Sequence, residues 1–434
     1  MSKVKGIGKK TESADWQAQK SKKQLKSSAA VRAFQKEWVR RTRERIDAGE
    51  PFGMCNAGEA EEIFLIMDIP VLVKQWWSGL IAAKQLSPYY FDLLDEKGYD
   101  ICRYCSLGLG CTMDRNPERS PWGGLPKPTV IIGGVLAGTD CDAGQRINEL
   151  WAREDDAYLY PLDVTARTGR YHRWWESIKD NWNEIIEPHR LDLRVEELKA
   201  LIRFLEITTG KTFSMARFRE VMDLVNEQSG YFRKARDLIA DTVPAPVSLP
   251  DQVSVYPAQW HRGTKAGLDL AKMFYKEVKE RVENGEAACP NEKLRLMWLG
   301  VGLWHNTAFY QYFEEKYGAV FTCSVYLAAA AEGYPRNVLD DPLRALASRH
   351  LFIGIGDSEW YVKEAKLNRV NGVVQLVSKN CRESVVTPLQ RMAFENAGIP
   401  VLPIYADNVD ARAWDDEQIK SQVSDFIETR IFSC

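Results

Sequence analysis

Short apolar runs alternate with amphipathic stretches along most of this chain. Nearly continuous apolar runs separated by helical stretches are typical of parallel sheets that are covered on both faces. The runs with the length and composition of buried strands cover residues 69–73, 129–136, 158–164, 294–301, 320–326, 351–355, 373–377 and 401–404. They fall into an early set and a late set, so the pattern predicts two separate α/β units.

The stretch between the two sets has helical periodicity. Val195, Leu198 and Leu205 share an apolar stripe that Gly210 ends, and Ser214 is placed to cap the next helix. We therefore expect an α/β fold with two parallel-sheet domains, flavodoxin-like or Rossmann-like, joined by a helical segment. The expected segments are a basic N-terminal arm with a docking helix (residues 1–50), a first α/β domain (51–173), a helical connecting region (174–292) and a second α/β domain (293–434).

Composition and charge narrow the class of protein. The chain is 45% hydrophobic and 27% charged, which is the balance of an ordinary globular protein, and no window resembles a membrane helix. Its lysine-rich start lacks the apolar stretch of a secretory signal, so we expect a cytoplasmic protein. Residues 1–45 carry 14 Lys and Arg against 4 Asp and Glu. No nucleic-acid-binding module follows, so we expect residues 29–45 to form a helix that docks on protein.

Nine cysteines are many for a reduced compartment, where they are buried thiols, metal ligands or redox groups more often than disulfides. Ligands of open parallel sheets bind beyond the carboxyl ends of the strands. Cys141 and Cys381 follow predicted strands, and Cys102 lies beside a short apolar run. Such thiols suit one iron–sulfur cluster with an iron left open, although buried thiols remain the alternative. We expect Cys323, Cys289 and Cys434 to be structural.

Other chemistries have weaker support. The chain has no G-x-x-x-x-G-K-[ST] phosphate loop and no G-x-S-x-G nucleophile elbow. Cys102-x2-Cys105-x5-Cys111 matches neither a zinc ribbon nor a ferredoxin run. His305 follows a predicted strand and is either a crevice residue or an ordinary loop histidine. Tryptophan pairs such as Trp76–Trp77 indicate either core packing or an aromatic-lined pocket that excludes water.

Three segments, in order, carry a family resemblance. GYDICRYCSLGLG contains Cys102, TDCDAGQR contains Cys141, and NGVVQLVSKNCRES contains Cys381. Together they resemble the cluster-cysteine segments of the large subunits of 2-hydroxyacyl-CoA dehydratases and ATP-dependent (class I) benzoyl-CoA reductases. The resemblance runs from about Phe52 to the C-terminus and leaves the basic arm outside the shared core.

The resemblance implies a [4Fe–4S] cluster held by Cys102, Cys141 and Cys381, with Cys105 or Cys111 as a possible replacement for Cys102. It also implies a homologous cluster-bearing partner subunit and an acyl-CoA substrate. A separate ATP-hydrolysing iron–sulfur activator, with ferredoxin as the upstream donor, would supply single low-potential electrons. The ATP is then used on the activator, which agrees with the lack of a phosphate loop in this chain.

The segment FGMCNAGEAEEIFLIMDIPVLV, with its spacing to Cys102, resembles the reductases more than the dehydratases. We therefore expect an iron–sulfur subunit of a benzoyl-CoA reductase that dearomatises an aromatic acyl-CoA. The alternatives are a 2-hydroxyacyl-CoA dehydratase subunit, an electron-relay subunit without a substrate site, and a cluster-free scaffold. The expected substrate-side residues are Cys55, Asn56, Trp76, Trp77 and His305.

Overall fold

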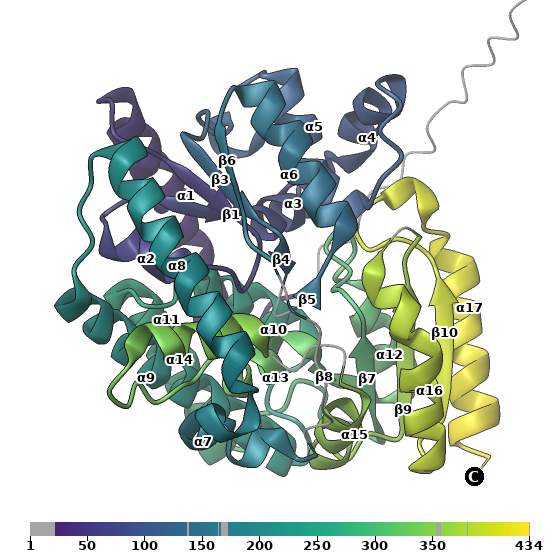
Figure 1. Cartoon of the computed structure of the whole chain (residues 1–434). Helices are drawn as coiled ribbons and strands as arrows, with labels where there is room; N and C mark the ends of the chain where they lie inside the picture. Colours follow the sequence, from purple (N-terminus) through teal and green to yellow (C-terminus); the bar gives the residue numbers. More distant parts are fainter. Residues whose placement is uncertain are drawn as a thin grey trace, which may run out of the picture.

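Two four-stranded parallel sheets form the framework of the computed structural model (Figure 1). The structure describes residues 22–136, 139–163, 165, 172–352, 357–379 and 381–433. The first sheet contains β1 (Gly53–Cys55), β2 (Val71–Val73), β3 (Val130–Gly133) and β6 (Tyr158–Pro161). The second contains β7 (Leu294–Leu299), β8 (Ala319–Ser324), β9 (Gly372–Val377) and β10 (Val401–Tyr405). A small antiparallel pair, β4 (Val135–Leu136) and β5 (Thr139–Asp140), follows β3.

The two sheets share one topology. Their strand orders are β2-β1-β3-β6 and β10-β9-β7-β8, so in each sheet the first strand lies between the second and the third. The chain therefore adds the second strand on one side of the first strand and the third strand on the other side. This creates a topological switch point at the carboxyl ends of β1 and β3 in the first sheet, and of β7 and β9 in the second. This arrangement confirms the predicted α/β class with two parallel sheets, and it repeats a pattern that the sequence does not show as an internal repeat.

Helices surround and connect the sheets. Those of the first half are α1 (Lys26–Asp47), α2 (Glu61–Ile66), α3 (Lys74–Ala83), α4 (Ser87–Glu96), α5 (Arg103–Asp114) and α6 (Asp142–Asp155). The middle region holds α7 (Ile178–Ile185), α8 (Pro188–Thr209), α9 (Met215–Asp241), α10 (Leu249–Val255) and α11 (Lys265–Glu283). The second sheet is accompanied by α12 (Phe309–Tyr317), α13 (Val325–Glu332), α14 (Pro342–Leu351), α15 (Ser358–Leu367), α16 (Thr387–Asn396) and α17 (Asp416–Phe426).

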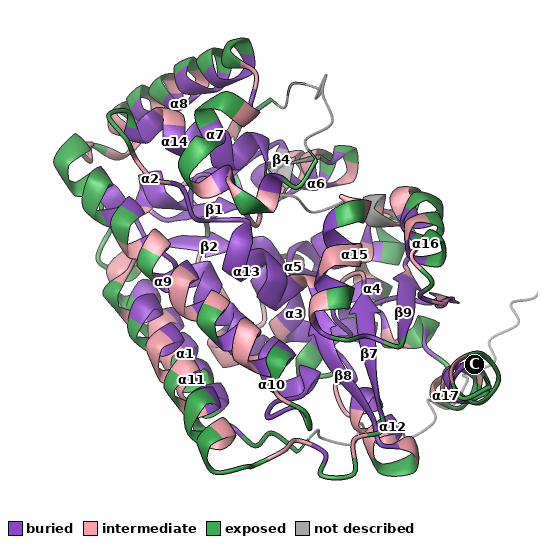
Figure 2. Cartoon of the chain, turned by 90° about the horizontal axis from the view of Figure 1, so that it is seen from below, coloured by how far each residue is buried: buried purple, intermediate pink, exposed green. Residues whose placement is uncertain are grey.

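Short helical turns complete the inventory: η1 (Pro121–Gly123), η2 (Trp174–Glu176), η3 (Tyr256–His261), η4 (Arg382–Val386), η5 (Ala411–Ala413) and η6 (Ile427–Ile431). Figure 2 shows that strands β7, β8 and β9 are buried, whereas the helices around them expose one face. Within the described residues, no helix is both long enough and apolar enough to cross a membrane.

The sequence pattern predicted most element boundaries, and the differences are local. Gly210 ends α8 in a left-handed conformation, and the Ser214 hydroxyl caps α9, as expected. The run at residues 351–355 was expected to be a strand, but Leu351 is the last residue of α14, and residues 353–356 lie outside the described part. Leu351 is buried as a helix residue, and an apolar residue in a run of five residues does not by its period distinguish a helix from a strand.

The basic arm contributes a helix that docks on its own chain. Helix α1 buries Val31 and Val39, and the half-buried Trp38 ring packs against the rings of Trp76 and His261 at 5.4 and 5.3 Å. The arm residues before position 22 lie outside the described part. The helix predicted over residues 29–45 is therefore confirmed, and its apolar side packs against α10 and α11.

A buried ionic network ties the start of the first unit to the helices of the middle region. Arg262 donates to Glu61 at 2.5 Å and to Glu62 at 2.7 Å, and Arg349 also pairs with Glu62. All four side chains are almost completely buried. Removing one member of such a network leaves a buried charge without compensation, which typically costs about 3–5 kcal/mol. The network therefore fixes α2, and with it the end of β1, against η3 and α14.

Candidate functional site

One cavity lies where the two units meet, at the carboxyl ends of their strands. Its volume is about 1060 Å³, which is at the upper end of the range for small-molecule sites. The lining residues are Arg103, Cys141, Asp142, Ala143, Val377, Ser378, Lys379, Cys381, Ser384, Val385, Tyr405, Ala406, Asp407, Asp410 and Ala413. Two of the three predicted cluster ligands, Cys141 and Cys381, therefore line the same cavity, although they come from different units of the chain.

The path of the chain after β3 places Cys141. At Gly134 the backbone has a φ of +132°, and a Cβ atom there would lie 1.8 Å from the carbonyl oxygen of Leu162. Only glycine fits this close approach, and it lets the chain leave the sheet and form the β4–β5 pair. Cys141 then becomes the N-cap of α6, where its sulfur accepts from the Gly144 N–H at 3.4 Å.

Cys381 is placed by the turn after β9. The Cys381 N–H donates to the Ser378 carbonyl at 3.3 Å, and the Ser384 hydroxyl donates to the same carbonyl at 2.7 Å. Cys381 thereby becomes the N-cap of η4 and is only half-buried. The prediction that Cys381 directly follows a strand end is confirmed.

Cys102 is brought to the same region from α5. It is the N-cap of that helix and is 4% exposed. Hydrogen bonding with Cys105 and burial raise the pKa of Cys102 well above its usual value, and Cys381 opposes the shift. Cys111 lies further along α5, where its sulfur donates to the Ser120 hydroxyl at 3.4 Å. Of the two replacements considered for Cys102, the structure brings Cys105 to the group and places Cys111 elsewhere.

The donor set suits a multi-iron cluster. Within the described chain, no three His, Cys, Asp or Glu side chains are grouped closely enough to hold one metal ion. An iron–sulfur cluster needs a different arrangement, because each iron binds one cysteine thiolate and the cysteine sulfurs therefore lie apart. Cys102 and Cys141 also precede full helices, α5 and α6, and cysteine side chains are the ligands that such clusters take. The residues present therefore fit such a group.

A second polar group lies at the end of β1. Cys55 ends that strand, and the Glu59 carboxylate accepts from the backbone N–H of Asn56 at 2.6 Å and from its amide at 3.0 Å. The Gln75 amide donates to the Asn56 side chain at 3.2 Å and contacts the Cys105 sulfur at 3.7 Å. Gln75 therefore links one predicted substrate-side residue, Asn56, to the Cys105 thiol of α5.

Burial controls the protonation of this second group. Desolvation raises the pKa of Glu59 to about 7, although Lys74 and the Asn56 hydrogen bonds oppose the shift. Desolvation also lowers the pKa of Lys74, against the attraction of Glu59, Cys55 and Cys105. The pKa of Cys55 is raised well above its usual value by burial and by the Glu61 and Glu59 carboxylates. A carboxyl group that titrates near neutral pH is a candidate proton carrier.

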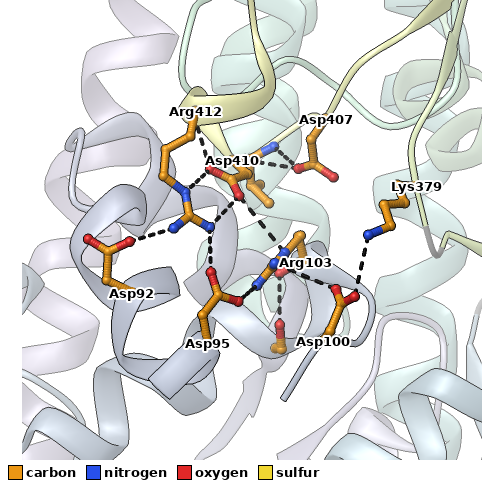
Figure 3. Close-up of polar contacts among 10 residues, drawn as sticks. Asp92, Asp95, Asp100, Arg103, Lys379, Asp407, Asp410 and Arg412 are labelled. Carbon is orange, nitrogen blue, oxygen red and sulfur yellow. Dashed lines mark hydrogen bonds and ion pairs between the residues drawn. The ribbon is translucent and has the colours of Figure 1, made fainter. Parts of the chain in front are cut away.

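An ionic network closes one side of the cavity (Figure 3). Arg412, which follows β10, pairs with Asp92 at 2.5 Å, with Asp95 at 3.1 Å and with Asp410 at 2.8 Å. Arg103, next to Cys102, pairs with the same Asp95 at 2.7 Å. Because Asp92 and Asp95 belong to α4 of the first unit, these pairs hold the two units together beside the thiols.

Lys379 adds a contact at the rim of the cavity. Its ammonium lies 3.3 Å from the Asp100 carboxylate, and both side chains are exposed. Because Lys379 follows β9 and Asp100 precedes α5, this pair also joins the two units. Figure 3 shows Lys379 and Arg103 on opposite sides of Asp100.

The structure places the other predicted substrate-side residues away from the cavity lining. Trp76 is 3% exposed and packs against Trp38 and His261, while Trp77 is fully buried beneath α5, next to Gly108. These contacts are those of core packing.

The His305 imidazole is buried behind β10. Its Nε2 atom lies 3.2 Å from the Asp407 carbonyl oxygen, and burial lowers the pKa of His305 to about 4. Asp407 lines the cavity, but His305 does not belong to the residues that surround it. A catalytic role for His305, Trp76 or Trp77 stays a prediction.

Sequence reasoning missed Glu59, Gln75 and Arg103. Glu59 follows Asn56 by three residues, a spacing that allows a carboxylate to accept from the preceding turn, and this local signal was available. Gln75 and Arg103 acquire their roles only through contacts across the fold. Cys323 and Cys289 are buried, as expected, whereas Cys434 lies outside the described residues.

Comparisons with known proteins give the family of the chain. A family model described as 2-hydroxyglutaryl-CoA dehydratase, D-component, matches residues 60–429. The (R)-2-hydroxyisocaproyl-CoA dehydratase alpha subunit of Clostridioides difficile is 24% identical over 390 residues, which cover 88% of this chain and 90% of that protein. The family match includes Cys102, Cys141 and Cys381 and leaves α1 outside.

Proposed function

The chain belongs to the 2-hydroxyglutaryl-CoA dehydratase D-component family, and we propose that it is an iron–sulfur subunit of a 2-hydroxyacyl-CoA dehydratase. Within the wider family of dehydratases and benzoyl-CoA reductases, the sequence patterns pointed to the reductase. The comparisons favour the dehydratase alternative, because the matching relative is a dehydratase subunit. The observation that carries the proposal is the cavity between the two sheets, which Cys141 and Cys381 line and Cys102 approaches.

We assign Cys102, Cys141 and Cys381 as the residues that hold a [4Fe–4S] cluster. When bound, such a cluster supplies one-electron chemistry and one iron that is open to a non-cysteine ligand. The protein places the three cysteine thiols at the N-caps of helical segments. The ionic network around Arg412 keeps the two units, and therefore the thiols from both, in register.

The residues around Glu59 handle protons in this proposal. Removal of water from a 2-hydroxyacyl thioester requires that a proton leave carbon and that the departing hydroxide be protonated. Glu59 is placed for such work, because its pKa is about 7 and Asn56 orients its carboxylate. Gln75 connects Asn56 to Cys105, so the proton-carrying group and the thiols belong to one contact network.

A benzoyl-CoA reductase subunit is the second candidate. The segment before Cys102 resembles that class. No tryptophan is among the described residues that line the cavity, so the tryptophan pairs do not add support to this candidate. An electron-relay role without a substrate site would use the same thiols but would leave Glu59 without a function. These alternatives differ in which acyl-CoA changes the spectrum of the reduced protein.

The similarity to an alpha subunit implies a complex of several subunits. We propose a homologous cluster-bearing partner and an ATP-hydrolysing iron–sulfur activator that receives electrons from ferredoxin. The acyl-CoA substrate would enter the cavity between the units. The basic residues of the N-terminal segment lie outside the family match, and we propose that their charge favours an acidic partner.

The test is a measurement of iron and acid-labile sulfide on protein that is co-expressed with its neighbours and purified without oxygen. We expect about four irons per chain. We also expect an EPR spectrum of the reduced protein that changes with 2-hydroxyisocaproyl-CoA and not with benzoyl-CoA. The opposite response would move the assignment to the reductase, and a cluster that responds to neither would favour the relay. Protein without iron would overturn the proposal.

Single variants test the ligands. Cys102→Ala, Cys141→Ala and Cys381→Ala should each lose most of the iron, whereas Cys323→Ala, at a buried strand cysteine, should keep it. Cys105→Ala and Cys55→Ala identify a different ligand set if they lose iron while one of the proposed three keeps it. Glu59→Gln should keep the iron and lose turnover, which separates a proton carrier from a residue that supports cluster binding.

A further inference from the structure

Asp407 differs from the other carboxylates that line the cavity between the two units. Asp142 is exposed, and Asp410 is buried but pairs with Arg412 at 2.8 Å. Asp407 is only 4% exposed, and it forms no ion pair with any of the described residues. It is therefore a buried carboxyl group that borders the cavity without a cation bound to it.

The turn after β10 orients the Asp407 side chain. Its Oδ1 atom accepts from the backbone N–H of Val409 at 2.9 Å and from that of Asp410 at 2.8 Å, which is the pattern of an Asx-turn. Its Oδ2 atom has no hydrogen-bond partner in the part of the chain that the structure describes. Figure 3 shows the carboxylate beside Asp410 and outside the ion pairs of Arg412 and Arg103. Because a polar atom is costly to bury without a partner, Oδ2 is placed to bind a polar group of a ligand in the cavity.

The groups of a 2-hydroxyacyl-CoA differ in whether they can bind such a carboxyl group. The phosphates and the thioester carbonyl offer only acceptors, and the phosphates also repel a carboxylate. The hydroxyl at C2 and the amide N–H groups of the pantetheine arm are donors. Burial raises the pKa of Asp407, and the backbone hydrogen bonds from Asp410 and Val409 oppose the shift. A hydroxyl both donates and accepts, so it suits the carboxyl group in either protonation state.

We propose that Asp407 Oδ2 binds the C2 hydroxyl of the substrate and so selects 2-hydroxyacyl-CoA over acyl-CoA without that hydroxyl. The inference rests on the proposed function, in which the reacting end of the substrate lies beside Cys141 and Cys381. Asp407 lines the same cavity as these cysteines, and the hydroxyl belongs to the reacting end, whereas the pantetheine arm extends away from it. A site that is built to bind a hydroxyl rejects an analogue without one, because its own polar atom is then left unpaired.

Binding measurements on the complex of this chain with its partner subunit test the inference. The complex is purified without oxygen and kept apart from the activator, so that no electron reaches the ligand and no ligand is consumed. Titration calorimetry compares (R)-2-hydroxyisocaproyl-CoA with isocaproyl-CoA, which has the same pantetheine arm and lacks the hydroxyl. We expect the unaltered protein to bind the hydroxylated ligand at least about tenfold more tightly.

Two variants of Asp407 separate ligand binding from the support of the turn. Asp407→Ser keeps one oxygen for the backbone N–H groups of Val409 and Asp410 and removes the second. It should weaken binding of the hydroxylated ligand about tenfold and change that of isocaproyl-CoA by less than about twofold. Asp407→Ala removes both oxygens and should show the same loss. Asp425→Ala removes the same charge at an exposed position of α17 outside the cavity, and should leave both affinities unchanged.

The outcomes distinguish this inference from the proposed function. Equal weakening of both ligands in Asp407→Ser would place the carboxyl group against the pantetheine arm, and unchanged affinities would show that Asp407 does not meet the ligand. Either result would overturn the inference, even where the unaltered protein contains iron and its spectrum responds to 2-hydroxyisocaproyl-CoA. Unaltered protein that lacks iron, or that binds neither ligand, would instead contradict the proposed function on which the inference rests.

Discussion

At the scale of single residues, the same side chain has different chemistry in different surroundings. Cys323 lies inside β8 and is a small apolar residue of the core, whereas Cys381 ends a turn and faces a cavity. Glu59 and Glu37 are both glutamates, but burial raises the pKa of Glu59 to about 7, and hydrogen bonds from Arg40 and Arg41 lower the pKa of exposed Glu37 to about 2. Surroundings, rather than residue type, decide which group can carry a proton at neutral pH.

A buried imidazole makes the stability depend on pH. His261 packs among the rings of Phe34, Trp38 and Trp76, and burial lowers its pKa from 6.5 to about 3. The folded chain therefore binds this proton more weakly than the unfolded chain does. The stabilisation is complete above pH 6.5 and is lost as the pH falls toward 3, at up to roughly 1.4 kcal/mol per pH unit.

His261→Phe should remove this dependence. Between pH 7 and about pH 5, the variant should lose roughly 2 kcal/mol less free energy of unfolding than the unaltered chain does. Urea denaturation of the iron-free protein at both pH values measures the difference. His189→Phe, at an exposed position of α8, is the control and should leave the pH dependence unchanged. If the free energy of unfolding changed equally with pH in His261→Phe and in the unaltered chain, the expectation would be wrong.

At the scale of elements, helix starts and strand ends build the site. Cys102 and Cys141 are N-caps of α5 and α6, and Cys381 begins η4. The same region also carries an exposed apolar stripe. Val385 in η4 and Leu389 and Met392 in α16 are 77%, 63% and 55% exposed, and Tyr405 at the end of β10 is 78% exposed. Because Val385 and Tyr405 also line the cavity, this stripe borders its mouth. Exposed apolar patches of this kind mark interaction surfaces.

We expect the partner subunit to cover this stripe. Leu389→Glu places a charge in the centre of the patch and should weaken the complex at least tenfold, which is about 1.4 kcal/mol. Stability of the isolated chain should change by less than about 0.5 kcal/mol, because the side chain is exposed. Ile207→Glu, at a position of α8 that is 84% exposed, is the matched control and should leave the complex intact. Sedimentation of the complex measures both, and equal affinity for the two variants would place the interface elsewhere.

At the scale of the whole molecule, function depends on how the two units are held together. Asp92 and Asp95 from the first unit and Asp410 from the second share Arg412, and Arg103 joins the same network next to Cys102. The cavity, which residues of both units line, exists only while this junction is closed. The network is partly exposed, so its contribution to stability is modest and depends on salt.

Arg412→Gln tests the junction. The variant should lose about 1 kcal/mol of unfolding free energy at low salt and less in about 1 M NaCl, because salt screens the pairs. Arg40→Gln removes exposed pairs within α1 and is the control, because these pairs do not join the two units. Equal unfolding free energies of Arg412→Gln and the unaltered chain at low salt would show that other contacts hold the units together.

The fold could be predicted from the sequence where it depends on interactions between residues that are close together along the chain. Apolar runs revealed the β3, β7 and β9 strands because buried parallel strands are almost continuously hydrophobic. The three-residue strand β1 was missed because Gly53–Cys55 is too short to show a period. Gly210 and Ser214 were identified because caps depend on neighbouring residues only.

The positions of the thiols were predicted less completely. The rule that ligands lie beyond strand ends correctly brought Cys141 and Cys381 to one cavity. It gave no reason to prefer Cys105 over Cys111 as a neighbour of Cys102. That choice depends on the geometry of α5, because residues three apart on a helix are neighbours on one face and residues nine apart need not be.

By itself, the sequence determined the α/β class, the docking helix, the resemblance to a family and the cysteines that follow strands. These features depend on local composition and periodicity, which a linear pattern carries. Only the tertiary structure showed that both sheets share one topology, that Trp76 and Trp77 belong to the core, and that Arg412 pairs with Asp92 and Asp95 across the junction. Those facts depend on contacts between side chains, and residues that are hundreds of positions apart come into contact only after the chain has folded.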